Sequence, residues 1–257
     1  YKFANNYNEK LKYILLNVVF LAIASYLRPI YSIFTIFFIY EFFKNFNKKI
    51  FFYYLLANII LSFPAIYYVF ILKINFFGMY IPYFNFSNTF ALTYLTILFY
   101  LIPFLIINFK YIKPNKIIYK NLIIIIVASL VVLCFFNYQP TNKGGGFFYY
   151  LSYLLFNNSF LVFLIFPFAF IIVNYFLEVK KIENLLLILI LIFLEIDTQF
   201  YVETYDPLLI LMILSLFNLN FINNFFNLNL SKNIVTLFVF LFFVYTIKLV
   251  QPYIVAL

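Results

Sequence analysis

The stretch TFALTYLTILFYLIPFLIINF, residues 89–109, decides the fold class of this chain. It is a continuous apolar run without a charged residue, and a helix of about 20 such residues is long enough to cross a bilayer. A strand of a membrane barrel would instead alternate apolar and polar side chains over about 10 residues. The stretch therefore predicts a transmembrane helix.

The composition of the whole chain extends this prediction to further segments. Of the 257 residues, 67% are hydrophobic and only 10% are charged, and the mean hydropathy is +1.05. Soluble domains average about 45–50% apolar and about 25% charged residues, so a water-soluble globular protein is excluded. We expect an all-α, polytopic helical membrane protein with about nine transmembrane helices. Residues 1–257 are expected to form a single membrane-embedded domain that lacks an upstream N-terminal part.

The expected spans are separated by segments rich in lysine, asparagine, glycine or proline. The first span ends at Arg28-Pro29, because proline disfavours a helical conformation for the residue before it. An aromatic segment, residues 147–156, is expected to lie along the membrane interface. The spans cover residues 11–27, 30–43, 50–72, 89–109, 121–136, 160–177, 185–194, a run that opens at Pro207, and 233–247.

The basic residues predict the orientation of the chain in the membrane. Counted over alternate loops, 13 of the 17 basic residues fall on one side, and Arg28, Lys73, Lys143 and Lys248 fall on the other. Cytoplasmic loops carry the excess of lysine and arginine, so the N-terminus is expected to be cytoplasmic. The net charge of +9 reflects this bias rather than a nucleic-acid partner. The expected location is a bacterial inner membrane or its equivalent, with the lipid bilayer as partner.

Four of the eight acidic residues gather in EIDTQFYVETYDP, residues 195–207, which we call the acidic loop. Carboxylates near a membrane are costly unless water or a ligand meets them, so the loop predicts the rim of a polar site. The count of basic residues places it on the extracytoplasmic face. Glu203, Tyr205 and Asp206 are candidates to bind a sugar hydroxyl or a divalent ion, or to supply a general base.

Three of the four acidic residues of this loop also have a purely structural interpretation. Asp206 before Pro207 is typical of a helix start, with the aspartate as N-cap and the proline at the first helical position. Glu195 and Asp197 are typical of a solvated helix end. Elsewhere, Glu41 and Lys44 are expected to form an interfacial pair.

Arg28 and Lys143 are candidates to bind a phosphate on the same face. Arg28 is the only arginine of the chain, and its planar fork suits bidentate contact with phosphate. It can equally be a snorkelling cation near a helix C-terminus. Lys143 precedes Gly144-Gly145-Gly146, which is the reverse of a phosphate-binding P-loop. We expect a flexible outer loop whose amides approach a ligand, with a plain linker as the alternative.

Cofactor chemistry is narrowly bounded. The chain has no histidine and one cysteine, Cys134, which removes the usual zinc and transition-metal ligands and the histidine-dependent catalytic triads. We expect no metal site and no cofactor. A divalent cation on carboxylates is the one option that stays open.

Two segments carry a family resemblance. Leu27-Arg28-Pro29 between two apolar runs resembles the corresponding segment of polytopic GT-C-type glycosyltransferases. Residues 201–207, YVETYDP, resemble a segment before a late span of the dolichyl-phosphoglucose α-1,2-glucosyltransferase family. The resemblance implies a membrane hexosyltransferase that uses a polyprenyl-phosphate sugar donor at the extracytoplasmic face. Arg28 would then lie near the donor phosphate, and Glu203 with Tyr205 at the rim of the substrate cavity.

The chain departs from that family at two points. The family's catalytic acidic residue lies in its first extracytoplasmic loop, whereas the first two outer loops here contain no aspartate or glutamate. A base upstream of Tyr1 is therefore expected. Thr204 also stands where the family has an arginine. A transporter or a lipid-linked oligosaccharide flippase is the alternative function, and a structural membrane subunit without chemistry is the third.

Overall fold

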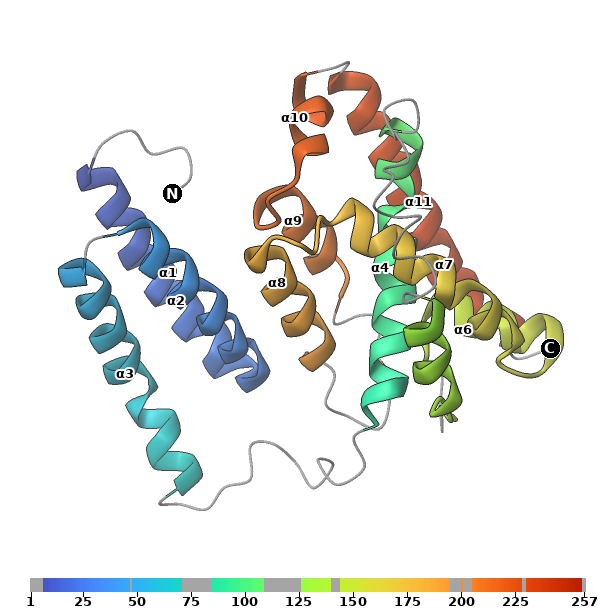
Figure 1. Cartoon of the computed structure of the whole chain (residues 1–257), viewed down its shortest axis with the longest axis horizontal. Coiled ribbons are helices and arrows are strands. Elements are labelled where there is room, and N and C mark those ends of the chain that lie inside the picture. The colour runs from blue at the N-terminus through green and yellow to red at the C-terminus, as the bar shows by residue number, and fades with distance from the viewer. Residues whose placement is uncertain are drawn as a thin grey trace. The chain divides into compact units, whose positions relative to one another are not determined.

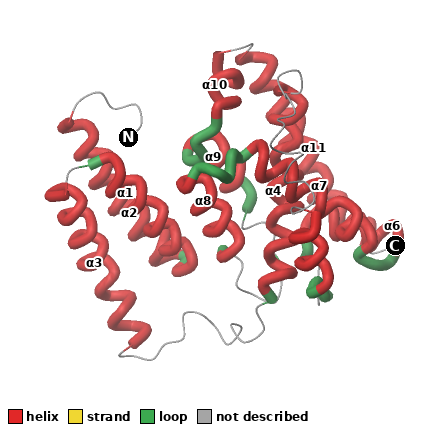
Figure 2. The backbone as a smooth tube through the Cα atoms, in the orientation of Figure 1, coloured by secondary structure: helices red, strands yellow, loops and turns green. Residues whose placement is uncertain are grey.

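The computed structural model of the chain is helical throughout the residues that it describes, which are 7–46, 48–70, 85–108, 126–139, 144–194, 200, 205–227 and 230–255. No strand occurs within these ranges, as Figure 2 shows, so the expected all-α class is confirmed. Residues 126–134 also form a short helix. The 3₁₀ helix η1 spans Pro29–Ile33. The other elements, labelled in Figure 1, are α1 (Tyr7–Leu27), α2 (Phe34–Asn45), α3 (Lys48–Phe70), α4 (Phe86–Asn108), α6 (Gly146–Phe156), α7 (Phe160–Phe176), α8 (Ile182–Phe193), α9 (Leu208–Ser215), α10 (Asn220–Asn227) and α11 (Leu230–Val255).

Within the described ranges, α4 is the one helix that is long and apolar enough to cross a membrane, judged by its length and composition. The expected count of nine spans is therefore not confirmed. Three of the expected spans correspond to short helices: α2 and α8 have 12 residues each and α9 has eight. At 1.5 Å per residue they extend roughly 12–18 Å, against a hydrocarbon core of about 30 Å. Helix α9 stops early because Asn218 and Asn220 follow it, and asparagine favours turns.

The chain forms two compact units, and each is described by itself. The first comprises Tyr1–Thr89 and Lys180–Gln199, and the second comprises Phe90–Val179 and Phe200–Leu257. The expectation of one membrane-embedded domain stays a prediction.

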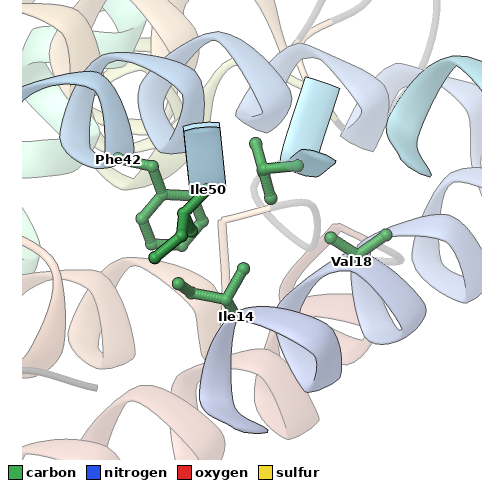
Figure 3. Packing of buried hydrophobic residues seen from close by; sticks show 5 residues of the cluster. Ile14, Val18, Phe42 and Ile50 are labelled. Carbon is green, nitrogen blue, oxygen red and sulfur yellow. The ribbon is translucent and has the colours of Figure 1, made fainter. Parts of the chain in front are cut away.

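The first unit is built on a small apolar cluster between α1, α2 and α3. Figure 3 shows Ile14 and Val18 of α1 facing Phe42 of α2 and Ile50 of α3. Tyr54 of α3 completes the cluster, and its ring meets that of Phe42 edge to face at 4.6 Å. Such aromatic pairs stabilise packing by about 0.5–1.5 kcal/mol beyond area burial. The cluster therefore ties three consecutive helices together at one level.

The connection between α1 and α2 is the turn predicted at Arg28-Pro29. Helix α1 ends at Leu27, Arg28 has an extended backbone with φ −139° and ψ 106°, and Pro29 opens η1. Proline imposes this geometry because its ring excludes a helical conformation at the preceding residue. A hydrogen bond of 2.6 Å from the Tyr26 hydroxyl to the Leu61 carbonyl joins the end of α1 to α3.

The second unit is organised around α4. Its side chains from Ala91 to Leu101 are all buried. Phe147 of α6 stacks on Phe99 at 4.6 Å, and Phe240 of α11 packs against the same ring at 5.3 Å. Helix α4 thus lies in the interior of this unit and not at its periphery.

Aromatic rings from two further helices also pack on α4. Near its start, Tyr94 meets Phe170 of α7 at 5.0 Å, and near its end Phe104 meets Phe225 of α10 at 5.6 Å. The Tyr94 hydroxyl also donates to the Asn174 side chain of α7 at 3.2 Å. Phenylalanine and tyrosine side chains therefore pack against α4 along its whole length.

Helices α6 and α7 form a tight corner that packs the two helices against each other. The Ser152 hydroxyl donates to the Asn158 carbonyl at 2.7 Å and accepts the Leu161 amide at 2.9 Å. One buried hydroxyl thus bonds two main-chain groups of the corner. Residues 147–156 belong to helix α6, which packs against α7, and their expected place along the membrane interface stays a prediction.

Candidate functional site

The sequence names five candidate site residues, and the structure describes three of them. Arg28 belongs to the first unit, whereas Tyr205 and Asp206 belong to the second. Lys143 and Glu203 lie outside the described residues, as do Glu195 and Asp197. The site is therefore built from the described ends of the acidic loop.

Tyr205 is fixed inside the second unit by a hydrogen bond and a ring stack. Its side chain is fully buried, and its hydroxyl lies 3.1 Å from the Thr93 hydroxyl of α4. Its ring stacks on Phe200, with centroids 5.2 Å apart and planes 20° from parallel. Burial of a tyrosine is favourable when its hydroxyl finds a partner. Tyr205 is therefore an anchor of the acidic loop.

Phe200 is held at the other described position of the loop by its main chain. Its amide donates to the Tyr138 hydroxyl at 3.0 Å, and its carbonyl accepts the Gly145 amide at 2.9 Å. The Tyr149 hydroxyl donates to the Tyr138 carbonyl at 3.2 Å. The two described positions of the loop, Phe200 and Tyr205, are therefore both fixed in the second unit.

Two of the three consecutive glycines belong to this anchor, so the expectation of a flexible outer loop is wrong for them. Gly144 and Gly145 are buried. A Cβ atom on Gly144 would lie 2.5 Å from the Tyr138 hydroxyl and 3.0 Å from the Phe200 carbonyl, which leaves room only for glycine. Gly145 has φ +104°, a left-handed conformation that glycine adopts without steric cost. Its amide donates to the Phe200 carbonyl and so does not approach a ligand as expected.

Asp206 does not cap α9, so this structural prediction is also wrong. Pro207 occupies the cap position, and no side chain bonds the free amides there. Asp206 instead belongs to the turn formed by residues 205–207 and is partly exposed. Its carboxylate faces the hydroxyl of Tyr100 on α4 closely enough to interact electrostatically. The helix starts one residue later than the sequence pattern indicated.

The Tyr100 hydroxyl is the unusual group of this site. Tyr100 is fully buried, and its hydroxyl lacks a hydrogen-bond partner among the described residues. The Asp206 carboxylate is the charged group that acts on this hydroxyl. A buried hydroxyl left unsatisfied costs about 1–3 kcal/mol.

Arg28 is available for binding in the first unit. Its side chain is exposed, while its amide donates to the Ala24 carbonyl at 2.9 Å and its carbonyl accepts the Tyr31 amide at 3.0 Å. The main chain is therefore fixed and the guanidinium faces outward. The phosphate contact expected of Arg28 stays a prediction.

The first unit also contains an ion pair that the sequence did not reveal. Lys44, at the end of α2, donates to the Glu183 carboxylate in the first turn of α8 at 2.8 Å. The hydrogen bond and the charge of Glu183 raise the pKa of Lys44 above its ordinary value of 10.5. Glu41, the expected partner of Lys44, instead accepts a hydrogen bond of 3.0 Å from Asn45. Lys44 therefore forms its ion pair with Glu183, which is distant in sequence, and not with Glu41 three residues before it.

Within the described ranges, no three histidine, cysteine, aspartate or glutamate side chains lie close enough together to hold a metal ion. Most of the acidic loop falls outside those ranges. The prediction about a divalent cation is therefore not tested here.

Sequence reasoning missed Tyr100 and Thr93, although a signal for them was present. Aromatic residues make up 26% of the chain, so a single tyrosine carries no information. Thr89, Thr93, Thr96 and Tyr100, however, are spaced four, three and four residues apart and lie on one face of a helix. All four are buried. The signal in the sequence is therefore a row of polar residues along one face of an apolar helix.

Compared with protein-family models, with curated proteins and with solved structures, the chain matches none of them.

Proposed function

We propose that the chain is a multi-pass integral membrane protein that transfers a sugar from a polyprenyl-phosphate donor at the extracytoplasmic face. The observation that carries the proposal is the polar pair of Tyr100 and Asp206, at the fixed end of the acidic loop. A buried hydroxyl and a partly exposed carboxylate are together suited to orient a sugar hydroxyl. The resemblance of residues 201–207 to a lipid-linked-sugar glucosyltransferase segment points to the same substrate class.

Large apolar side chains on the outer faces of several helices support the membrane part of the proposal. The exposed fractions are 64% for Phe20 and 79% for Leu27 on α1, and 64% for Phe63 on α3. They are 63% for Phe168 on α7 and 74% for Phe242 on α11. Large apolar side chains in such number are unusual on the surface of a soluble protein, whereas lipid chains solvate them.

Contacts between distant segments support the proposed sidedness. Lys44 and Glu183 lie at ends that the count of basic residues assigns to the cytoplasmic side, and they pair within the first unit. In the second unit, Gly145 bonds Phe200, and both belong to loops assigned to the outer side. A wrong number of spans between the members of either pair would assign them to opposite sides.

The proposed reaction is attack of an acceptor hydroxyl on the anomeric carbon of the donor sugar. The bond from that carbon to the phosphate oxygen breaks, polyprenyl phosphate leaves with the electron pair, and the proton of the acceptor hydroxyl passes to a general base. Arg28 and Lys143 are proposed to counter the phosphate charge that grows as the bond breaks. Glu203, Tyr205 and Asp206 are proposed to line the sugar-binding part of the site.

Transfer of radiolabelled glucose from polyprenyl-phosphate glucose, measured in membranes that contain the chain, tests this function. Arg28→Ala and Glu203→Gln are each expected to lower the rate at least about tenfold, because each removes a charged contact to the substrate. Lys180→Ala, on the cytoplasmic side, is the control and should leave the rate unchanged. Wild-type rates in both site variants would contradict the site, and no transfer by the wild-type chain would contradict the function.

A second candidate is a transporter or lipid-linked oligosaccharide flippase, and one observation favours it. Asp206 faces Tyr100, which lies in the middle part of α4, the helix long enough to cross a membrane. Transporters place ionisable residues at mid-membrane between short, interrupted helices. Translocation of a lipid-linked sugar across proteoliposomes without any sugar transfer would support this candidate over the first.

A further inference from the structure

The first unit brings the starts of two long helices, α1 and α3, to the same level. A hydrogen bond of 3.3 Å runs from the Tyr54 hydroxyl of α3 to the side-chain oxygen of Asn17 on α1. Further along both helices, the Tyr26 hydroxyl of α1 donates to the Leu61 carbonyl of α3 at 2.6 Å. The two bonds join residues in the same order along α1 and α3. The helices therefore run in the same direction.

This register places three lysines of the two helices at one level. Lys12 precedes Asn17 by five residues on α1, and Lys49 precedes Tyr54 by five residues on α3. At about 1.5 Å per residue, both lysines lie roughly 7.5 Å from the bonded pair along the helix axes. Lys48 comes directly before Lys49, and all three lysines are exposed. We call Lys12, Lys48 and Lys49 the lysine patch.

The positive charge of the lysine patch is not neutralised by a carboxylate of the described residues. The ion pair that these residues form is that of Lys44 with Glu183, and Glu41 accepts a hydrogen bond from Asn45. The first turn of α3 begins with two lysines of the patch and contains no acidic residue. Because a helix start favours acidic side chains, these lysines do not stabilise their own helix. The patch is therefore suited to an external anion.

Exposed apolar side chains adjoin the lysine patch on both helices. Tyr13 directly follows the patch on α1, and Leu15 comes two residues later. Phe52 and Tyr53 lie within about one turn of the patch on α3, and both are exposed as well. A surface with a charged end and an apolar side fits an amphiphile whose head group carries negative charge. A soluble phosphate or an acidic peptide would leave the apolar side chains in water.

We propose that the lysine patch binds the phosphate head group of an anionic phospholipid, whose acyl chains lie along the exposed apolar side chains of α1 and α3. Clusters of lysines beside apolar helices attract anionic lipids at the cytoplasmic surface of membranes. The count of basic residues assigns this end of the first unit to the cytoplasmic side. The phospholipid is distinct from the proposed sugar donor, and its binding does not depend on sugar transfer.

Equilibrium binding to the purified full chain in a neutral detergent tests the proposal with two probes that carry the same dye, phosphatidylglycerol and phosphatidylcholine. We expect phosphatidylglycerol to bind at least about tenfold more tightly, because the head group of phosphatidylcholine has no net charge. Lys48→Gln combined with Lys49→Gln should weaken phosphatidylglycerol binding at least about tenfold and leave phosphatidylcholine binding unchanged. Lys48→Arg combined with Lys49→Arg retains the charge and should bind both lipids as wild type does.

Lys49→Gln and Lys232→Gln form a matched pair of single variants, because each removes an exposed lysine from the first turn of a long helix. Lys49→Gln should weaken phosphatidylglycerol binding about fivefold, whereas Lys232→Gln should leave it unchanged. Equal losses in the two variants would show that total charge attracts the lipid, and would overturn the inference.

Two further outcomes would also overturn the inference. One is equal affinity of the wild-type chain for the two lipids. The other is competition by free glycerol phosphate that is as strong as competition by unlabelled phosphatidylglycerol, because the acyl chains would then contribute nothing. The assay contains no sugar donor, so each of these results would leave the proposed sugar transfer to its own test.

Discussion

Gly144 illustrates how one residue holds the acidic loop in place. The absence of a side chain lets the main chain approach Tyr138 and Phe200 closely, and the neighbouring Gly145 amide then reaches the Phe200 carbonyl. The glycine run is therefore needed for packing. A substitution here should act on the loop through its anchor and not through a ligand contact.

We expect Gly144→Ala to destabilise the protein by about 1–3 kcal/mol, the usual cost of forcing an extra methyl group into a packed interior. Unfolding in detergent by chemical denaturant measures the change. Tyr138→Phe removes the oxygen that lies nearest the added methyl group, so the double variant should lose less than the sum of the single variants. Strict additivity would contradict the close approach of these two residues.

The Thr93–Tyr205 pair is a second residue-level test. Tyr205→Phe leaves the buried Thr93 hydroxyl without its partner, and we expect a loss of about 1–3 kcal/mol. Thr93→Val combined with Tyr205→Phe should cost less than the two single changes together, because no polar group is then stranded. The same denaturant assay measures all four proteins, and a neutral Tyr205→Phe would refute the anchor.

At the scale of elements, the short helices α8 and α9 matter most, because the acidic loop joins them. Tyr205 fixes the start of α9 against α4 in one unit, and Lys44 fixes the start of α8 against α2 in the other. These contacts lie at the ends of the helices. Each short helix is therefore held by a tertiary contact, since its own hydrogen bonds give little stability at such lengths.

The ion pair between α2 and α8 predicts a pH dependence at the alkaline end. Because the pKa of Lys44 is raised in the folded state, its contribution is fully present below 10.5 and is lost as the pH rises through the folded pKa. We expect Glu183→Gln to unfold at a slightly lower temperature than wild type near neutral pH. The difference is small because half of the Lys44 side chain is exposed. It should vanish once the pH exceeds the raised pKa of Lys44 and shrink in high salt.

At the scale of the whole molecule, two observations describe how the chain relates to a bilayer. Exposed aromatic and aliphatic side chains cover helices of both units, while lysines gather in alternate connections. The first property is expected of a protein in contact with lipid, and the second predicts its orientation in a membrane. Neither property depends on how the two units are placed.

Cysteine accessibility tests this orientation. In a Cys134→Ala background, which removes the one exposed free thiol, we expect a membrane-impermeant reagent added outside cells to label Thr204→Cys but not Lys113→Cys. Permeabilised cells provide the control, because both cysteines should then react. The reverse pattern in intact cells would contradict the proposed common face of Arg28 and the acidic loop.

The sequence by itself determined the helical class, the turn at Arg28-Pro29 and the approximate positions of the helices. These properties follow from local physics: the length of apolar runs, the restriction that proline places on its neighbour, and the distribution of charge. The same local rules assigned Asp206 to the cap position of a helix, which Pro207 occupies. They also paired Lys44 with Glu41, whereas the hydrogen-bonded partner of Lys44 is Glu183.

Only the tertiary structure decided which polar groups meet. Phe200, Tyr138 and Gly145 are far apart in sequence, and no spacing rule joins them. The chain has 25 tyrosines and 41 phenylalanines, so composition could not mark Tyr100 as the one whose buried hydroxyl faces a carboxylate. Burial depends on which helices surround α4, and that is a property of packing between distant segments rather than of any local pattern.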